Sequence, residues 1–245
     1  MEWLVEVVGD DSVLRRLCEA CVSPEVTICE VEEDCFVLKS TDFKALENVV
    51  TVYNKACEIV ELIVGATRIA TGSKIGMGHV IEVDEEGKKR RHTLCSGESQ
   101  IQIDLEMTMT IGDGPAFKIF NSIDQAASVP VWCAMAKKNE RVEKVLRLIS
   151  EGSLDFNKLN ILFEEVQGDV GSKITDAKWA TETEIEHFTR TAQPYRHGKS
   201  GLGGWTPPKH PLKFESAKSL VMRIIANWLK SKADEEGSTL ENIEA

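Results

Sequence analysis

Short apolar segments separated by polar turns dominate the first part of the chain. Runs of this length bounded by turn residues are typical of β-strands. Between the first two segments, Asp11 and Ser12 can cap a short helix that runs to about residue 21. Gly87 can take the positive φ that a hairpin turn needs. The pattern therefore predicts a strand at residues 3–8 and two hairpins, one of residues 26–30 with 35–39 and one of residues 80–83 with 90–94.

A long amphipathic helix is predicted in the middle of this region. From Thr41 the apolar positions recur at steps of three and four residues, which is the period of one helical face. The pattern stops near Gly72, and glycine is a common helix-ending residue. The positions that define this face are Leu46, Val49, Val50, Tyr53, Cys57, Val60, Ile63 and Val64.

Residues 100–111 alternate strictly between apolar and polar side chains. A period of two predicts a strand with one dry and one wet face. A deep pocket lined by this strand would favour a nucleotide-binding regulator.

Helical spacing replaces these patterns after the Gly112–Pro115 turn, over residues 123–138, 140–150, 156–166, 182–191 and 215–230. We therefore expect an α+β protein. Residues 1–115 would form an N-terminal mixed α/β domain with antiparallel strands and one long helix, a sensor or interaction domain. Residues 116–232 would form a C-terminal all-α helical bundle, and residues 233–245 an acidic tail that frays.

Composition narrows the protein class. The first residues are acidic, and no apolar run approaches the roughly 18–20 residues that a membrane-spanning helix needs. The seven cysteines are an odd number, which favours reduced thiols over a disulfide framework. These features predict a soluble cytoplasmic protein with no membrane partner.

Four of those thiols, Cys18, Cys21, Cys29 and Cys35, lie close enough in sequence to suggest zinc. The second pair lacks Cys-x-x-Cys spacing, and Cys18 lies on the apolar side of its predicted helix. We favour buried core thiols, and we expect no metal site and no cofactor.

Charge is unevenly distributed along the chain. The net charge is −11, but residues 188–232 carry nine Lys and Arg against Glu215 alone, which is +8 and leaves −19 elsewhere. This basic segment could bind a polyanion, or its charges could be neutralised by nearby acids. A second basic run, Lys88–His92, falls on a predicted hairpin, where a charged sheet edge that resists further strand pairing is favoured over phosphate contact.

Arg190 precedes His197 by seven residues, after several helices and before a Gly/Pro-rich loop and a closing helix. This Arg-x6-His arrangement resembles the end of a HEPN domain, a family of all-α bundles that includes metal-independent ribonucleases of toxin–antitoxin, abortive-infection and CRISPR systems. Two residues depart from the family pattern. Thr191 stands where asparagine is usual, and Pro194 should break a helix through the motif.

The resemblance implies an RNase used in bacterial stress or phage defence, paired as a homodimer with two motifs facing each other. Histidine can transfer a proton near neutral pH, and a fixed cation can stabilise the transition state of phosphodiester cleavage. Under this hypothesis Arg190 and Arg196 supply the cation and His197 the proton transfer. Tyr195 would stack on a base, and the adjoining cations would contact RNA; these are Lys199 and Lys209.

Non-catalytic alternatives remain open. Arg190 and Arg196 could pair with acids of residues 182–186, and His197 could cap a helix end. The protein would then be an interaction module whose basic last helix docks a regulatory protein, a ligand or nucleic acid.

Overall fold

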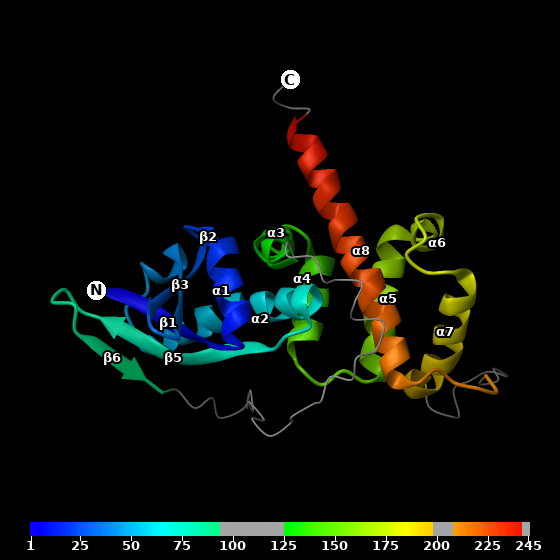
Figure 1. Ribbon diagram of the computed structural model, residues 1–245, viewed down its shortest axis with the longest axis horizontal. Helices are drawn as coiled ribbons and strands as arrows, with labels where there is room; N and C mark the ends of the chain where they lie inside the picture. Colours follow the sequence, from blue (N-terminus) through cyan, green and yellow to red (C-terminus); the bar gives the residue numbers. More distant parts are fainter. Residues whose placement is uncertain (94–124, 198–207, 242–245) are drawn as a thin grey trace. The chain divides into compact units, whose positions relative to one another are not determined.

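The computed structural model describes residues 1–93, 125–197 and 208–241 (Figure 1). Within this part the chain divides into two compact units, Met1–Ala134 and Met135–Ala245. The first contains an antiparallel sheet with helices and the second is helical, so the fold is α+β, as expected. The division falls later than the expected boundary after residue 115, because the 3₁₀ helix Gln125–Ala127 contacts helices α1 (Asp11–Ala20) and α2 (Val49–Thr71) of the first unit.

The described residues of the first unit form a six-stranded sheet in the order β2-β3-β4-β1-β5-β6. Every pairing is antiparallel, which confirms the two hairpins expected from sequence, β3 with β4 and β5 with β6. Gly87 turns the second hairpin with a φ of 79°. The strands are β1 Glu2–Gly9, β2 Val22–Ser23, β3 Val26–Glu32, β4 Cys35–Lys39, β5 Ile75–Val83 and β6 Lys89–His92.

Helices α1 (Asp11–Ala20) and α2 (Val49–Thr71) pack against this sheet. Asp10 caps α1 through the backbone N–H of Val13, and Gly72 ends α2 in the left-handed conformation at φ 74°, as its sequence position indicated. Trp3 ties β1 to the segment before α2, because its indole N–H donates to the Leu46 carbonyl at 3.0 Å. The long helix starts later than expected, after a 3₁₀ turn at Thr41–Phe43.

The basic run at residues 88–92 forms β6, which is an edge strand of the sheet among the strands described. Lys89 forms an ion pair with Glu32 at the end of β3. These observations agree with the interpretation of this run as a charged sheet edge. The predicted strand at residues 100–111 lies outside the described residues.

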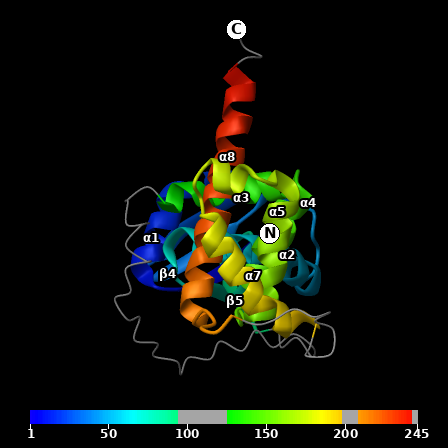
Figure 2. The same cartoon turned by 90° about the vertical axis from the view of Figure 1, so that its right-hand side faces the viewer.

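The second unit is arranged around α5, which contacts α4, α6, α7 and α8. In Figure 2, α7 lies in front with α5 and α8 behind it. Helix α3 (Ser128–Ala136) crosses the division between the units. The remaining helices are α4 Glu140–Ser150, α5 Phe156–Val170, α6 Lys173–Asp176, α7 Glu182–His197 and α8 Phe214–Glu241.

Helix α8 is longer than its apolar pattern predicted, because it continues through part of the acidic segment expected to be a tail and ends at Glu241. One contact that supports this extension joins Lys173 of α6 to Glu235 at 2.6 Å. In the part of the chain that the structure describes, none of the helices has the length and apolarity needed to span a membrane.

Candidate functional site

Helix α7 carries the Arg-x6-His motif, and the side of this helix opposite Arg190 is buried. Phe188, Thr191 and Ala192 are at most 3% exposed, and the Phe188 ring packs edge-on against Phe163 of α5 at 5.4 Å. Arg190 lies on the other side of the helix with 43% of its side chain exposed. The face of α7 that carries Arg190 is therefore turned toward solvent.

The expectation that Pro194 breaks the helix is wrong, because α7 continues through it to His197. Proline lacks an N–H, so the carbonyl four residues earlier, that of Arg190, loses its helical partner. At 100° per residue, Pro194 lies about 40° from Arg190, on the outer face, where water can hydrate this carbonyl. The same geometry places His197 about two turns after Arg190 and within about 20° of the same face.

Thr181 and Glu184 fix where α7 begins. The backbone N–H of Glu184 donates to the Thr181 hydroxyl at 3.2 Å, and the Glu184 carboxylate accepts the Thr181 backbone N–H at 2.8 Å. This reciprocal pair is a capping box. Glu184 also accepts from Arg223 of α8 at 2.7 Å. Burial would raise the pKa of Glu184, but these hydrogen bonds outweigh it and lower that pKa.

Arg190 is held by Glu186, one turn earlier on α7, at 3.2 Å. The alternative in which Arg190 pairs with an acid of residues 182–186 is therefore confirmed for this arginine. Pairing with an exposed carboxylate does not remove the guanidinium from solvent. The side chains of Arg196 and His197 lie outside the described part, so their approach to Arg190 stays a prediction.

Tyr195 belongs to an aromatic cluster that its sequence neighbours do not reveal. Its ring stacks on Phe156, at the start of α5, with centroids 4.6 Å apart and an angle of 19° between planes. Phe214, the first residue of α8, meets Phe156 edge-on at 5.5 Å. Phe156 is thus a site residue that sequence reasoning missed, since the ring contact joins helices far apart in the chain.

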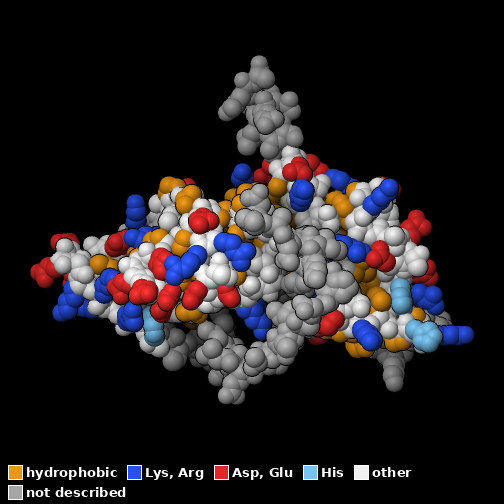
Figure 3. Space-filling model, viewed as in Figure 1, with side chains coloured by type: hydrophobic (Ala, Val, Ile, Leu, Met, Phe, Trp, Pro, Cys, Tyr) orange, Lys and Arg blue, Asp and Glu red, His pale blue; other side chains and the backbone are white. Residues whose placement is uncertain are grey.

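The segment that precedes α8 forms hydrogen bonds with α7 on both the exposed and the buried side of that helix. The Thr191 hydroxyl donates to the His187 carbonyl at 2.8 Å and accepts the Leu212 N–H at 3.1 Å. The His187 ring lies 2.7 Å from the His210 carbonyl through Nε2. These contacts hold Lys209 beside α7, where Figure 3 shows histidine and Lys/Arg side chains close together. Lys209 is exposed, whereas Lys199 lies outside the described residues.

Replacing Thr191 by valine is expected to lower the free energy of unfolding by about 1–2 kcal/mol, because the Leu212 N–H loses a part-buried acceptor while the side-chain shape is kept. Hydrogen exchange at Leu212 would report the loss locally, and denaturant unfolding would give its size. Thr191→Ser is the matched control, since it retains the hydroxyl. A valine variant as stable as the wild type, beside a destabilised serine variant, would show that the methyl group, rather than the hydroxyl, matters.

Ion pairs neutralise much of the basic segment. Of its nine cations, seven have described side chains, and four of these pair with acids: Arg190 with Glu186, Lys218 with Glu215, Arg223 with Glu184, and Lys232 with Asp169. The other three are exposed: Lys209, Lys213 and Lys230.

A hollow of about 480 Å³ lies against the first half of α7, lined partly by Glu182, Ile185 and Glu186 and by Gln167 and Gly171 at the end of α5. Its two carboxylates suit a phosphate poorly. It also includes none of the residues predicted to contact RNA. We therefore place the candidate site at the other half of α7.

No group of metal-ligating side chains occurs among the described residues. Cys18, Cys21, Cys29 and Cys35 are free thiols, and Cys21 is fully buried. Burial raises the pKa of Cys21 to about 12, so this group remains a neutral thiol at physiological pH.

Comparison of the chain with protein-family models, with curated proteins and with solved structures finds no match.

Proposed function

We propose that the helical unit is a HEPN-like effector that cleaves RNA without a metal ion, in bacterial stress or phage defence. The observation that carries this proposal is the continuity of α7 through Pro194. It supports a placement of Arg190 and His197 on one outward face, about two turns apart, with the opposite face fixed by Phe188 and Thr191. The sheet-containing unit would sense a ligand or a regulatory protein.

In the proposed reaction, His197 takes the proton of a ribose 2′-hydroxyl, and the 2′-oxygen attacks the adjacent phosphorus. The bond from phosphorus to the 5′-oxygen breaks, and the leaving oxygen takes a proton from a second acid. The products are a 2′,3′-cyclic phosphate and a 5′-hydroxyl. Arg190 and Arg196 stabilise the negative charge that develops on the phosphoryl oxygens. A homodimer with facing motifs would supply the second histidine as that acid.

The test is cleavage of labelled tRNA and single-stranded RNA in EDTA by the purified full chain. We expect Arg190→Ala and His197→Ala each to reduce the rate roughly a hundredfold. Lys230→Ala is the matched control, because this exposed cation lies on α8 away from the motif. Cleavage that survives His197→Ala, or that requires a divalent ion, would contradict the proposal, and product termini other than those above would contradict the mechanism.

The second candidate is a non-enzymatic interaction module. It is favoured by the ion pairs of the basic segment, since four of its seven described cations already have acidic partners. RNA binding in a separate affinity measurement, with no cleavage in the assay above, would support this alternative. Size-exclusion chromatography with light scattering would test the homodimer separately.

A further inference from the structure

The aromatic side chain of Tyr195 is unusual because it is exposed to solvent and yet held in a fixed orientation. It is 61% exposed, yet its ring lies nearly parallel to that of Phe156 at 4.6 Å. Phe156 covers one face of the tyrosine, so the exposed area includes the opposite face. A ring that only closed the end of the core would be expected to be buried, because burying an aromatic side chain is strongly favourable.

Three helices each contribute one ring to the aromatic cluster that holds this stack in place. Phe156 begins α5, which Asp155 caps through the Lys158 N–H at 2.7 Å. Phe214 begins α8 and supports Phe156 edge-on, at 80° between the ring planes. Tyr195 lies near the end of α7. The tyrosine ring is thus oriented before any ligand arrives, which reduces the entropy lost on binding.

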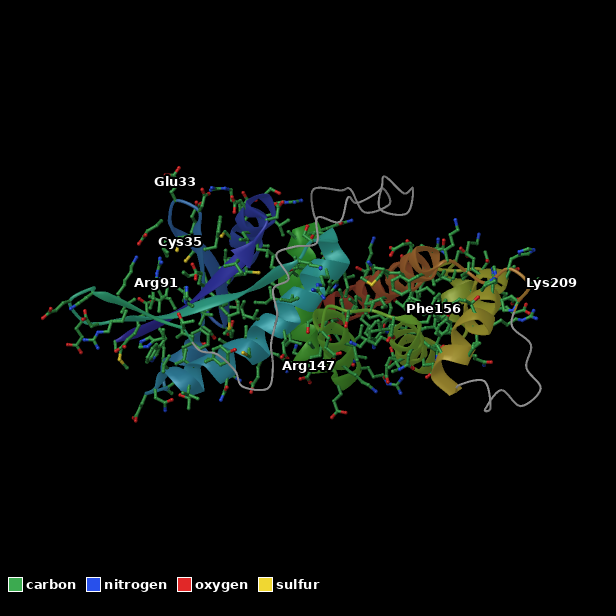
Figure 4. The ribbon with its side chains drawn as sticks, turned by 90° about the horizontal axis from the view of Figure 1, so that it is seen from below. Glu33, Cys35, Arg91, Arg147, Phe156 and Lys209 are labelled. Atoms are coloured by element: carbon green, nitrogen blue, oxygen red, sulfur yellow. The ribbon has the colours of Figure 1, made fainter. Side chains whose placement is uncertain are left out.

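Positive charge borders the same end of the unit. Lys213 immediately precedes Phe214, and Lys209 lies on the segment that His187 and Thr191 fasten to α7. Both lysines are exposed. The start of α8 adds the positive end of a helix dipole. Figure 4 views this end and labels Phe156 and Lys209 on it.

We infer that the Phe156–Tyr195 stack is a platform for an unpaired nucleobase, with Lys209 and Lys213 contacting the adjoining phosphates. Aromatic rings stack on bases of any sequence, whereas cations along the strand bind its phosphates. A base inside a duplex already has both faces covered by its neighbours, so the platform selects single-stranded nucleic acid. Because Tyr195 and His197 are two residues apart, this inference deepens the proposed function and rests on it for the chemistry: the platform would place a strand beside His197.

The experiment measures binding of a fluorescent single-stranded RNA, of the same RNA in a duplex, and of an abasic strand of equal length. It is done in EDTA with a 2′-O-methyl group on each ribose, which blocks the attacking hydroxyl and so prevents cleavage. Tyr195→Ala should weaken binding of the single strand roughly tenfold and leave duplex and abasic binding unchanged. Tyr195→Phe should retain wild-type affinity, and Phe156→Leu should weaken binding less than Tyr195→Ala does.

Salt dependence separates stacking from phosphate contact. Lys213→Ala should reduce the slope of log affinity against log salt by about one, whereas Tyr195→Ala should leave this slope unchanged. Val50→Ala, at another exposed apolar residue, is the control for loss of exposed apolar surface. Circular dichroism and thermal unfolding of each variant would establish that it is folded.

The two proposals fail differently. Single-strand binding that depends on Tyr195, without any cleavage of unmodified RNA, would overturn the proposed nuclease and support the platform. Cleavage that depends on Arg190 and His197, with unchanged affinity in Tyr195→Ala, would overturn the platform alone. Equal losses for single strand, duplex and abasic strand, or no binding by the wild type, would also overturn the platform.

Discussion

Asp169→Ala is expected to lower the free energy of unfolding of the helical unit by about 2–4 kcal/mol, although this aspartate lies outside the candidate site. Asp169 near the end of α5 accepts the indole N–H of Trp228 at 2.8 Å and the ammonium group of Lys232 at 2.9 Å. Trp228 is fully buried. Alanine would leave the indole N–H without this acceptor and Lys232 without its counter-ion. Denaturant unfolding would give the total loss, and hydrogen exchange along α5 and α8 would localise it.

Asp169→Asn is the matched control, because it retains an acceptor for Trp228 and removes only the charge. Asp169→Asn should lower the free energy of unfolding less than Asp169→Ala does. The difference in unfolding free energy between the two variants measures the hydrogen bond to the indole. If alanine and asparagine were equally destabilising, the ion pair with Lys232 would account for the whole effect.

The effect of Asp169 should also depend on pH. Burial would raise the pKa of this carboxyl group, but hydrogen bonds from Lys232 and Trp228 outweigh burial and lower it. A lowered pKa in the folded state means that the stabilisation is present above the unfolded value, about 3.9, and is lost as pH falls through the folded value. The stability difference between wild type and Asp169→Asn should therefore shrink below about pH 4. A difference that is constant through this range would contradict the assignment.

The fold was predictable where a period or a turn residue identifies an element locally. The spacing of apolar residues before Gly72 indicated α2, and Gly87 indicated the hairpin of β5 and β6. The strand order was not predictable, because it depends on contacts between distant segments. The full length of α7 was not predicted, because Pro194 was treated as a helix-breaking residue without regard to the face of the helix on which it lies. The Thr-x-x-Glu spacing of Thr181 and Glu184 was a readable signal for the start of α7.

The candidate site was predictable only in part, because only contacts between residues close in sequence leave a signal in the sequence. The exposed position of Lys209 and the partly exposed side chain of Arg190 follow from their polarity. The pairing of Arg190 with Glu186 follows from their four-residue spacing on one helix. The contact between Tyr195 and Phe156 has no such local signal, because α5 and α7 meet only in the folded unit.

Phe188→Ala is expected to be the most destabilising change, at about 3–5 kcal/mol. The side chain is fully buried and packs edge-on against Phe163, so alanine would leave a cavity between α5 and α7. Phe188→Leu should cost less, because it fills most of that volume. Denaturant unfolding of both variants, with hydrogen exchange along α7, would measure the two effects.

Phe188 also links packing to the proposed chemistry. It lies on the buried face of α7, about 160° around the helix from Arg190, and would contact no substrate. If its packing orients the outer face, Phe188→Ala should reduce RNA cleavage more than the fraction of unfolded protein accounts for, and Phe188→Leu should restore most of the activity. A Phe188→Ala variant that unfolds at the wild-type denaturant concentration would show that α7 is held in place by other contacts, of which the capping box at Thr181 and the Arg223–Glu184 pair are the strongest candidates.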